Sequence, residues 1–179
     1  MAQLTARIPN IATIAPEVIS TLQAFSQAGA GLGVSPGTVQ LVQLRASQIN
    51  GCSVCVDMHA RFMQKAGETV ERLVAVSAWR DSPLFTDAER AALALAECVT
   101  RLSDRPDPVP DDVWAEAARH YDAKGLVGLL VGVTAINAWN RLNVPTHQVA
   151  GEWIASQGAK EAAEWTSRAE RSGAAARSS

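Results

Sequence analysis

The sequence predicts an all-α protein built around one compact helical domain. Hydrophobic residues make up 47% of its 179 residues, enough for a core, while aromatic residues make up only 5%. Alanine is abundant, and this composition favours packed helices over a sheet. No segment alternates strictly between apolar and polar residues, as a half-buried strand would. We expect a single domain over residues 1–171 and a disordered, Ser/Ala-rich tail over 172–179.

The first two predicted helices are separated by the glycine-rich segment AGAGLG. The first covers residues 16–27 after an N-terminal arm, and the glycines end it. The second starts at Ser35-Pro36, because serine caps a helix and proline suits its first position. It ends at the turn Asn50-Gly51. Its apolar residues that recur at helical spacing and should face the core are Val39, Val42, Ala46 and Ile49.

Three further helices are predicted in the middle of the chain. One begins near Cys52 and ends at Gly67, a residue suited to a left-handed C-terminal cap. A short one covers residues 69–79. Thr86 and Glu89 then form a capping box that opens a long helix to about residue 102. The apolar stripe of that long helix consists of Ala91, Leu95, Cys98 and Leu102.

The C-terminal part begins with a proline-rich loop over residues 103–110. A helix over 111–121 follows, and then one over 123–140 that is apolar nearly all around and should be central. Pro145 limits the extent of this helix. A last short helix is predicted over 161–171.

Composition and charge argue against several classes of protein. The net charge of −2 offers no basic face for a nucleic acid. No uncharged apolar run approaches the roughly 18–20 residues of a membrane span, and the N-terminus lacks the pattern of a secretory signal. With an odd count of three cysteines, these features predict a cytoplasmic protein in a reducing environment.

The most informative pattern is C-x-x-C-x-x-x-H, formed by Cys52, Cys55 and His59 in the run SQINGCSVCVDMHARFMQKAG. Residues three apart are neighbours on a helix, so the two thiols can close a disulfide. At a helix start, free backbone N–H groups and the macrodipole favour the reactive thiolate. His59 lies on the same face and can accept the thiol proton. The pattern indicates thiol redox chemistry.

Two other interpretations of the cysteines remain open: a buried structural pair, or half of a zinc site. A zinc site needs a second set of ligands, and the chain offers only Cys98, His120 and His147, without the usual spacing. Taken alone, His59 would be an ordinary hydrogen-bonded core histidine. We expect no bound metal and no cofactor, since no phosphate-binding loop and no nucleotide or flavin motif is present.

The blocks SQINGC-x-x-C-x-x-MH, AGE, SAWR-x-SPLF, ERAALALAE and INAWNRL resemble the alkylhydroperoxidase D-like branch of the carboxymuconolactone decarboxylase superfamily. The similarity covers about residues 36–143. It implies a compact helical subunit that assembles into homotrimers or homohexamers, with a hydroperoxide substrate and a dithiol protein or lipoyl-type donor as reductant. By the family pattern, Cys55 would attack the peroxide, Cys52 would resolve the product, and His59 would relay protons.

The chain departs from this family at Gln40. Peroxidase members usually carry a glutamate twelve residues before the first cysteine, and that position is Gln40 here. A glutamine keeps the hydrogen-bonding capacity but cannot act as a base near neutral pH. Gln43, one turn along, is also neutral. The truncated relay leaves three outcomes: slower peroxide turnover, disulfide exchange with a partner, or a catalytically inactive protein that keeps the fold.

Other residues have simpler interpretations. Glu97 is either an alternative proton acceptor or a carboxylate at a helix surface or interface, and Asp57 is solvated or pairs with Arg61. The tryptophans suit a core or a subunit interface, and Trp139 and Asn140 lie near the pocket or an interface. The competing hypothesis is a non-redox member: a lactone decarboxylase-like enzyme, or a helical oligomer with a structural or regulatory role. Decarboxylation is acid–base chemistry and does not need the dithiol.

Overall fold

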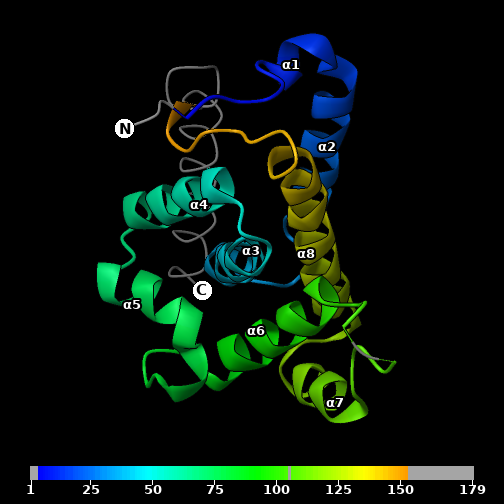
Figure 1. Cartoon of the computed structure of the whole chain (residues 1–179). Coiled ribbons are helices and arrows are strands. Elements are labelled where there is room, and N and C mark those ends of the chain that lie inside the picture. The colour runs from blue at the N-terminus through cyan, green and yellow to red at the C-terminus, as the bar shows by residue number, and fades with distance from the viewer. Residues whose placement is uncertain (1–3, 105, 153–179) are drawn as a thin grey trace.

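The computed structural model describes residues 4–104 and 106–152, and all regular secondary structure in these ranges is helical (Figure 1). This confirms the all-α prediction. The elements are α1 (Ile11–Ile14), α2 (Pro16–Ala28), α3 (Pro36–Asn50), α4 (Ser53–Lys65), α5 (Val70–Ala75), the 3₁₀ helix η1 (Val76–Asp81), α6 (Asp87–Thr100), α7 (Asp111–His120) and α8 (Ala123–Asn143).

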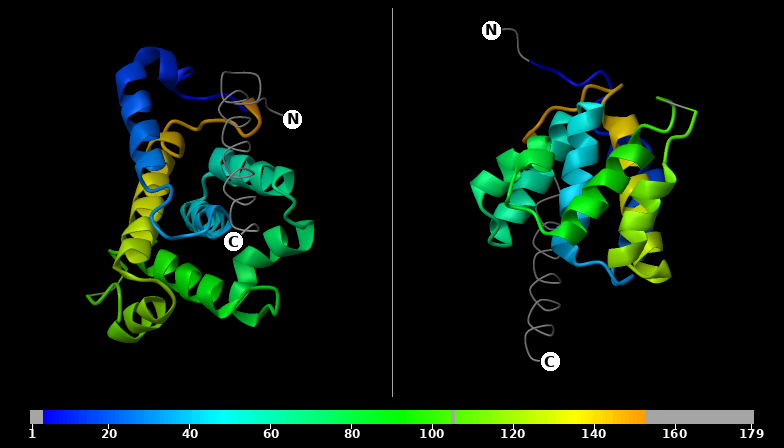
Figure 2. Two further views of the ribbon diagram at one scale, coloured as in Figure 1. Left: turned by 180° about the vertical axis from the view of Figure 1, so that it is seen from behind. Right: turned by 90° about the horizontal axis from the view of Figure 1, so that it is seen from below.

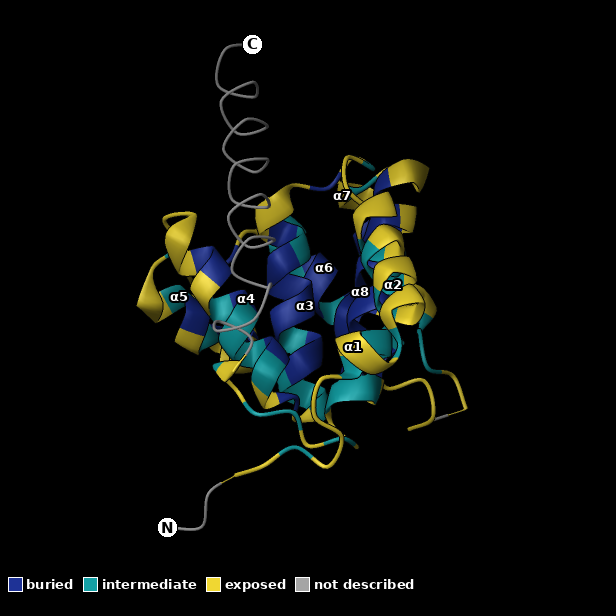
Figure 3. Ribbon diagram, turned by 90° about the horizontal axis from the view of Figure 1, so that it is seen from above, coloured by how far each residue is buried: buried dark blue, intermediate teal, exposed yellow. Residues whose placement is uncertain are grey.

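The central element is α3, seen end-on in the middle of Figure 1. It packs against α4 on one side, α6 on another and α8 on a third. Outside this group, α2 lies along α8, as the left view of Figure 2 shows, and α7 packs on α6 and α8. Most of the surface of α3 is therefore buried (Figure 3).

Helix starts follow the predicted caps. Ser35 Oγ accepts the backbone N–H of Thr38 at 3.1 Å, and Pro36 occupies the first turn of α3. At α6, Glu89 N–H donates to Thr86 Oγ1 at 3.2 Å and Thr86 N–H donates back to Glu89 Oε2 at 2.9 Å. Both pairs satisfy backbone donors that a helix leaves free at its start. The capping box predicted at Thr86 is confirmed.

Three predicted boundaries differ from the structure. The helix predicted over 69–79 divides, because Ala78 leaves helical geometry (φ −126°, ψ 35°) within the 3₁₀ segment that follows α5. The predicted stripe of α6 is wrong at Leu102, which is 56% exposed because the helix ends at Thr100. In contrast, α8 extends three residues beyond the predicted end, to Asn143.

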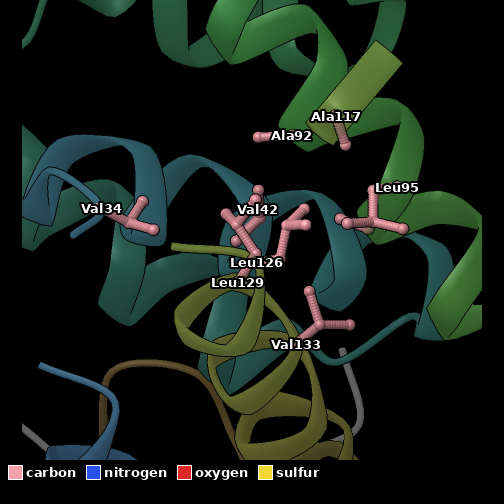
Figure 4. Packing of buried hydrophobic residues seen from close by; sticks show 9 residues of the cluster. Val34, Val42, Ala92, Leu95, Ala117, Leu126, Leu129 and Val133 are labelled. Atoms are coloured by element: carbon pink, nitrogen blue, oxygen red, sulfur yellow. The ribbon is translucent and has the colours of Figure 1, made fainter. Parts of the chain in front are cut away.

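The largest cluster of buried apolar side chains lies between α3, α6 and α8 (Figure 4). Val42 of α3, Leu95 of α6 and Leu129 of α8 are among its members. The segment before α3 packs closely on α8 at Gly128. A Cβ atom added to Gly128 would lie only 3.0 Å from Cβ of Leu32 in that segment. A side chain at Gly128 would push these segments apart.

Helix α8 is long and apolar enough to cross a membrane if only length and composition are considered. Within the protein, 56% of its most apolar window is buried. This agrees with the core helix predicted from its sequence. The predicted helix over 161–171, the tail over 172–179, Trp153 and Trp165 lie outside the described residues.

Candidate active site

The two cysteines of the motif lie where α3 turns into α4. Gly51 adopts the left-handed conformation (φ 69°), which glycine reaches at little cost, and this reverses the chain after α3. Cys52 is the N-cap of α4, and Cys55 lies in its first turn. Both are free thiols, and their residues are only 2% and 1% exposed. The sequence therefore places both sulfurs inside the protein.

His59 and Gln40 form a second pair beside the thiols. His59 follows Cys55 by one turn of α4, and its Nδ1 lies 2.6 Å from Oε1 of Gln40 on α3. Since the glutamine oxygen accepts, the proton of the neutral imidazole lies on Nδ1 and the lone pair on Nε2. That Nε2 is buried and is the one buried side-chain nitrogen or oxygen in the described residues without a hydrogen-bond partner. A small substrate, a thiol or a water could fill this position.

Burial lowers the pKa of His59 from an ordinary value of 6.5 to about 4. The imidazolium would lose its hydration without gaining a negative charge nearby, because Gln40 is neutral. His59 is therefore uncharged at neutral pH. It can accept a proton at Nε2, but it is a weak base.

The two thiols share one negative charge unequally. The hydrogen bond from the Cys55 thiol lowers the pKa of Cys52 to about 7, and this outweighs burial, which alone would raise it. The same hydrogen bond, together with burial, raises the pKa of Cys55. The Cys55 backbone N–H also favours the Cys52 thiolate, although no capping hydrogen bond of ordinary geometry forms. A single negative charge on the pair is therefore favoured on Cys52 and disfavoured on Cys55.

A group of asparagines from α8 reaches the dithiol. Asn143 Nδ2 lies 3.4 Å from Cys55 Sγ. Asn140 Nδ2 donates to Ser47 Oγ at 3.2 Å, and Asn140 Oδ1 accepts from Asn50 Nδ2 at 2.8 Å. The sequence suggested Asn140 near a pocket or an interface but did not identify Asn143 or Asn50. The sequence does contain a signal for Asn143: Asn137, Asn140 and Asn143 are spaced three apart at the end of an otherwise apolar helix.

Glu97 belongs to a different site. Its Oε1 accepts from Arg45 Nε at 2.7 Å and from Trp79 Nε1 at 3.0 Å, and its Oε2 accepts from Arg80 at 2.7 Å. Burial alone would raise its pKa, but the hydrogen bonds from Trp79 and the two arginines lower it. Glu97 is thus an ionised, buried carboxylate with structural partners; of the positions expected from sequence, the helix surface is wrong.

The remaining residues considered from the sequence lie away from the dithiol or have structural partners. Arg61 Nε lies 2.7 Å from Asp57 Oδ1, which confirms this predicted ion pair. Cys98 is buried, His147 is exposed, and His120 pairs with Glu116 near the end of α7. In the part of the chain that the structure describes, no three His, Cys, Asp or Glu side chains gather as metal ligands.

Two hollows lie away from the dithiol. One, of about 240 Å³, is lined by Trp79, Arg90 and Glu116 among others. The second, of about 430 Å³, lies over Arg80, Glu97 and Arg101. Neither of these two hollows is lined by the motif cysteines, whose residues are only 2% and 1% exposed.

The sequence and the fold match known proteins. The sequence model of the carboxymuconolactone decarboxylase family matches residues 16–97. The uncharacterized protein YdfG of Bacillus subtilis is 33% identical over 131 residues, which span 73% of this chain and 88% of YdfG. The uncharacterized protein YnjA of Escherichia coli is 36% identical over 107 residues, 59% of this chain and 57% of YnjA.

Solved structures also resemble this chain. An Agrobacterium tumefaciens protein of unknown function, proposed as the antioxidant defence protein AhpD, has a TM-score of 0.77 and 33% identity, covering 82% of this chain and 98% of its own. The debrominase Bmp8 shares the fold at 17% identity, with a TM-score of 0.67 over 77% of this chain and 73% of its own. The chain therefore belongs to the carboxymuconolactone decarboxylase family, in its alkylhydroperoxidase D-like branch.

Proposed function

We propose that the chain is a thiol-dependent peroxidase that reduces hydroperoxides through a dithiol–disulfide cycle of Cys52 and Cys55. The observation that carries this proposal is the pair of free, buried thiols at the start of α4, one turn before His59, with the pKa of Cys52 lowered. A structural cysteine pair has no need of a lowered pKa, whereas a redox pair requires the thiolate. Membership of the alkylhydroperoxidase D-like branch supports the same chemistry.

The cycle begins with the Cys55 thiolate, after its proton moves to Cys52 or to His59 Nε2. Cys55 attacks the terminal oxygen of a hydroperoxide, the O–O bond breaks, and the alcohol leaves with the proton that Cys55 had passed to Cys52 or His59, so that Cys52 is a thiolate. The Cys55 sulfur is then a sulfenic acid. The Cys52 thiolate displaces its hydroxyl, which takes a proton from solvent and leaves as water, and the disulfide forms. An external dithiol supplies two electrons and two protons and restores both thiols by exchange.

His59 and Gln40 serve proton transfer in this proposal. His59 is one turn from Cys55, and its buried Nε2 accepts no hydrogen bond from the residues that the structure describes. Gln40 fixes the tautomer that presents this lone pair. Because Gln40 adds no negative charge, the imidazole remains a weak base and we expect slow turnover.

The proposal extends to partners and location. The reductant is a dithiol protein or a lipoyl-type group, since the cycle needs a two-electron thiol donor. The subunit works as a homotrimer or homohexamer in the cytoplasm, where such donors keep thiols reduced.

A thiol titration tests the function directly. The reduced protein is titrated before and after one equivalent of hydroperoxide, with Cys55→Ser and Cys98→Ser variants alongside. Loss of two thiols per chain in the wild type and in Cys98→Ser, but not in Cys55→Ser, supports the proposal. An unchanged thiol count in the wild type would contradict it and favour a non-redox member of the family.

The attacking cysteine is identified by trapping the sulfenic acid with dimedone. In Cys52→Ser, the resolving thiol is gone, and we expect the adduct on Cys55 by peptide mass. In Cys55→Ser, we expect none. The charge at rest lies on Cys52, so an adduct on Cys52 in Cys55→Ser, with none in Cys52→Ser, would reverse the assignment of the two roles.

A further inference from the structure

We propose that Asn143 is a catalytic residue that holds the negative charge on the Cys55 sulfur through its side-chain amide. This role rests on the proposed function and adds to it a group from the far end of the chain. Asn143 Nδ2 lies 3.4 Å from Cys55 Sγ, although 88 positions separate the two residues. That distance is within the hydrogen-bonding range of a sulfur acceptor, which is longer than that of oxygen.

An amide donor affects the two protonation states of a sulfur differently. A neutral thiol is a weak acceptor, whereas a hydrogen bond to an ionised group is about twice as strong as one between neutral groups. The donor therefore stabilises the thiolate more than the thiol. The Asn143 amide lowers the pKa of both motif cysteines, in the direction this argument requires.

The Cys55 thiolate needs such a donor because of where it lies in the fold. Asn143 is the last residue of α8, and the carbonyl end of a helix carries partial negative charge that disfavours a nearby anion. Burial of Cys55 disfavours the anion further. A directed N–H donor compensates for both effects at the sulfur itself.

The other amides near the dithiol already have partners. Asn140 Nδ2 donates to Ser47 Oγ at 3.2 Å, and Asn50 Nδ2 donates to the oxygens of Asn137 and Asn140. These bonds tie α8 to the end of α3. Asn140 also favours the thiolates, but at Cys55 its effect is smaller than that of Asn143, whose amide lies 3.4 Å from the sulfur.

The chain after α8 keeps Asn143 in position. Its carbonyl oxygen accepts the backbone N–H of Gln148 at 3.1 Å and the hydroxyl of Thr146 at 3.3 Å. The N-terminal arm fastens the same turn, because Arg7 N–H donates to the Thr146 carbonyl at 2.8 Å. The amide is therefore carried on a closed turn and not on a free helix end.

The donor acts in both halves of the cycle. In the oxidative half, the Cys55 proton passes to Cys52 or to His59 Nε2, and the amide stabilises the thiolate that attacks. In the reductive half, an external thiolate attacks Cys52, the S–S bond breaks, and its electron pair goes to Cys55. The amide then stabilises Cys55 as the leaving thiolate.

The test measures the pKa of Cys55 in the full chain. In a Cys52→Ser background, the rate of iodoacetamide alkylation is followed against pH, and peptide mass separates Cys55 from Cys98. We expect Asn143→Ala to raise the apparent pKa of Cys55 by about one unit and to slow alkylation at pH 7 about tenfold. Asn143→Asp should raise it further, because a carboxylate repels the thiolate.

Two variants keep the result interpretable. Thr134→Ala changes an exposed polar residue of the same helix to alanine and should leave the pKa unchanged. Asn143→Ser keeps a short donor and should recover part of the loss. If Asn143→Ala fails to fold by circular dichroism, the comparison of Asn143→Ser with Asn143→Asp decides, and equal pKa values in those two overturn the inference.

The outcome separates this inference from the proposed function. An unchanged Cys55 pKa in Asn143→Ala overturns the role of Asn143, while peroxide-driven loss of two thiols in the wild type still supports the peroxidase. If the pKa rises in Asn143→Ala but the wild type keeps its thiols under peroxide, the amide holds a thiolate and the peroxidase proposal fails.

Discussion

The pair of Gln40 and His59 sets the strength of the base beside the dithiol. A 2.6 Å hydrogen bond joins them, and burial lowers the pKa of His59 to about 4. A carboxylate in place of the amide would stabilise the imidazolium by charge, which an amide cannot do. The difference between one oxygen and one nitrogen at Gln40 therefore changes the proton affinity of His59.

Gln40→Glu should raise the pKa of His59 and increase peroxide turnover. Because general-base assistance contributes about 10²–10⁴-fold when complete, we expect at least a tenfold gain in kcat/KM with a dithiol reductant. Gln48→Glu adds the same charge to α3, next to Arg45, and should change turnover little. Equal turnover in Gln40→Glu and wild type would show that the carboxylate does not limit the reaction.

His59 should also make stability depend on pH. In the unfolded chain its pKa is near 6.5, and in the folded protein it is about 4. Between these values the unfolded state binds more protons, so the free energy of unfolding rises with pH and falls as the solution is acidified. Across this window the loss amounts to roughly 3 kcal/mol for a fully buried group.

The measurement compares urea unfolding of the wild type with that of His59→Asn at several pH values from 4 to 7. Carboxylates titrate in both proteins, so the difference between the two curves isolates His59. The wild type should lose more stability on acidification than the variant. Parallel curves would mean that His59 can charge within the folded protein at little cost.

At the scale of elements, local signals predicted helix starts well and helix ends less well. Ser35 and Thr86 cap the helices that they were expected to cap, because capping depends on residues within one turn. Leu102 was misplaced because α6 ends early at Thr100. The break at Ala78 lies next to Trp79, which packs into the core, and no local pattern indicated it.

Glu97 joins three elements at one buried carboxylate. Arg45 comes from α3, Trp79 and Arg80 come from η1, and Glu97 itself comes from α6. The Arg45 side chain is only 14% exposed, so its charge depends on this partner. Removing one member of such a buried pair leaves the other charge unpaired.

Glu97→Gln should therefore destabilise the fold by about 3 kcal/mol, seen as a lower midpoint of thermal or urea unfolding. Glu116→Gln is the matched control: it breaks the surface contacts with Arg119 and His120 and should cost less than about 1 kcal/mol. The dithiol should still oxidise in Glu97→Gln at a temperature where the variant is folded. A loss no larger than that of Glu116→Gln would show that solvent reaches Arg45 and replaces the carboxylate.

At the scale of the whole molecule, the candidate site could be predicted only in part. The motif Cys52, Cys55 and His59 lies within two turns of one helix, and Gln40 was found by counting back along the chain. Asn143 could not be found in this way, because it meets Cys55 only when α8 packs beside α4. The same holds for Glu97, whose partners lie 17 to 52 positions away.

The outer surface of the molecule indicates how subunits could assemble. Large apolar side chains remain exposed on the outer side of the N-terminal helices: Ile14 is 67%, Val18 50% and Phe25 39% exposed. Val18 and Phe25 are seven residues apart on α2 and so lie on one face. Burying such a face against another subunit removes apolar area from water. We expect this surface to contribute to the proposed homotrimer or homohexamer.

Light scattering with size-exclusion chromatography checks the assembly. The wild type should have three or six times the mass of one chain, and Val18→Glu with Phe25→Glu should reduce it, since charges would be buried at the contact. The variant should keep its helical circular dichroism, because both residues face outward in the single chain. Glu17→Gln and Gln27→Ala, exposed on the same helix but off this face, serve as controls and should leave the mass unchanged. A wild-type mass of one chain would rule out the assembly, and an unchanged mass in the double glutamate variant would place the contact on another face.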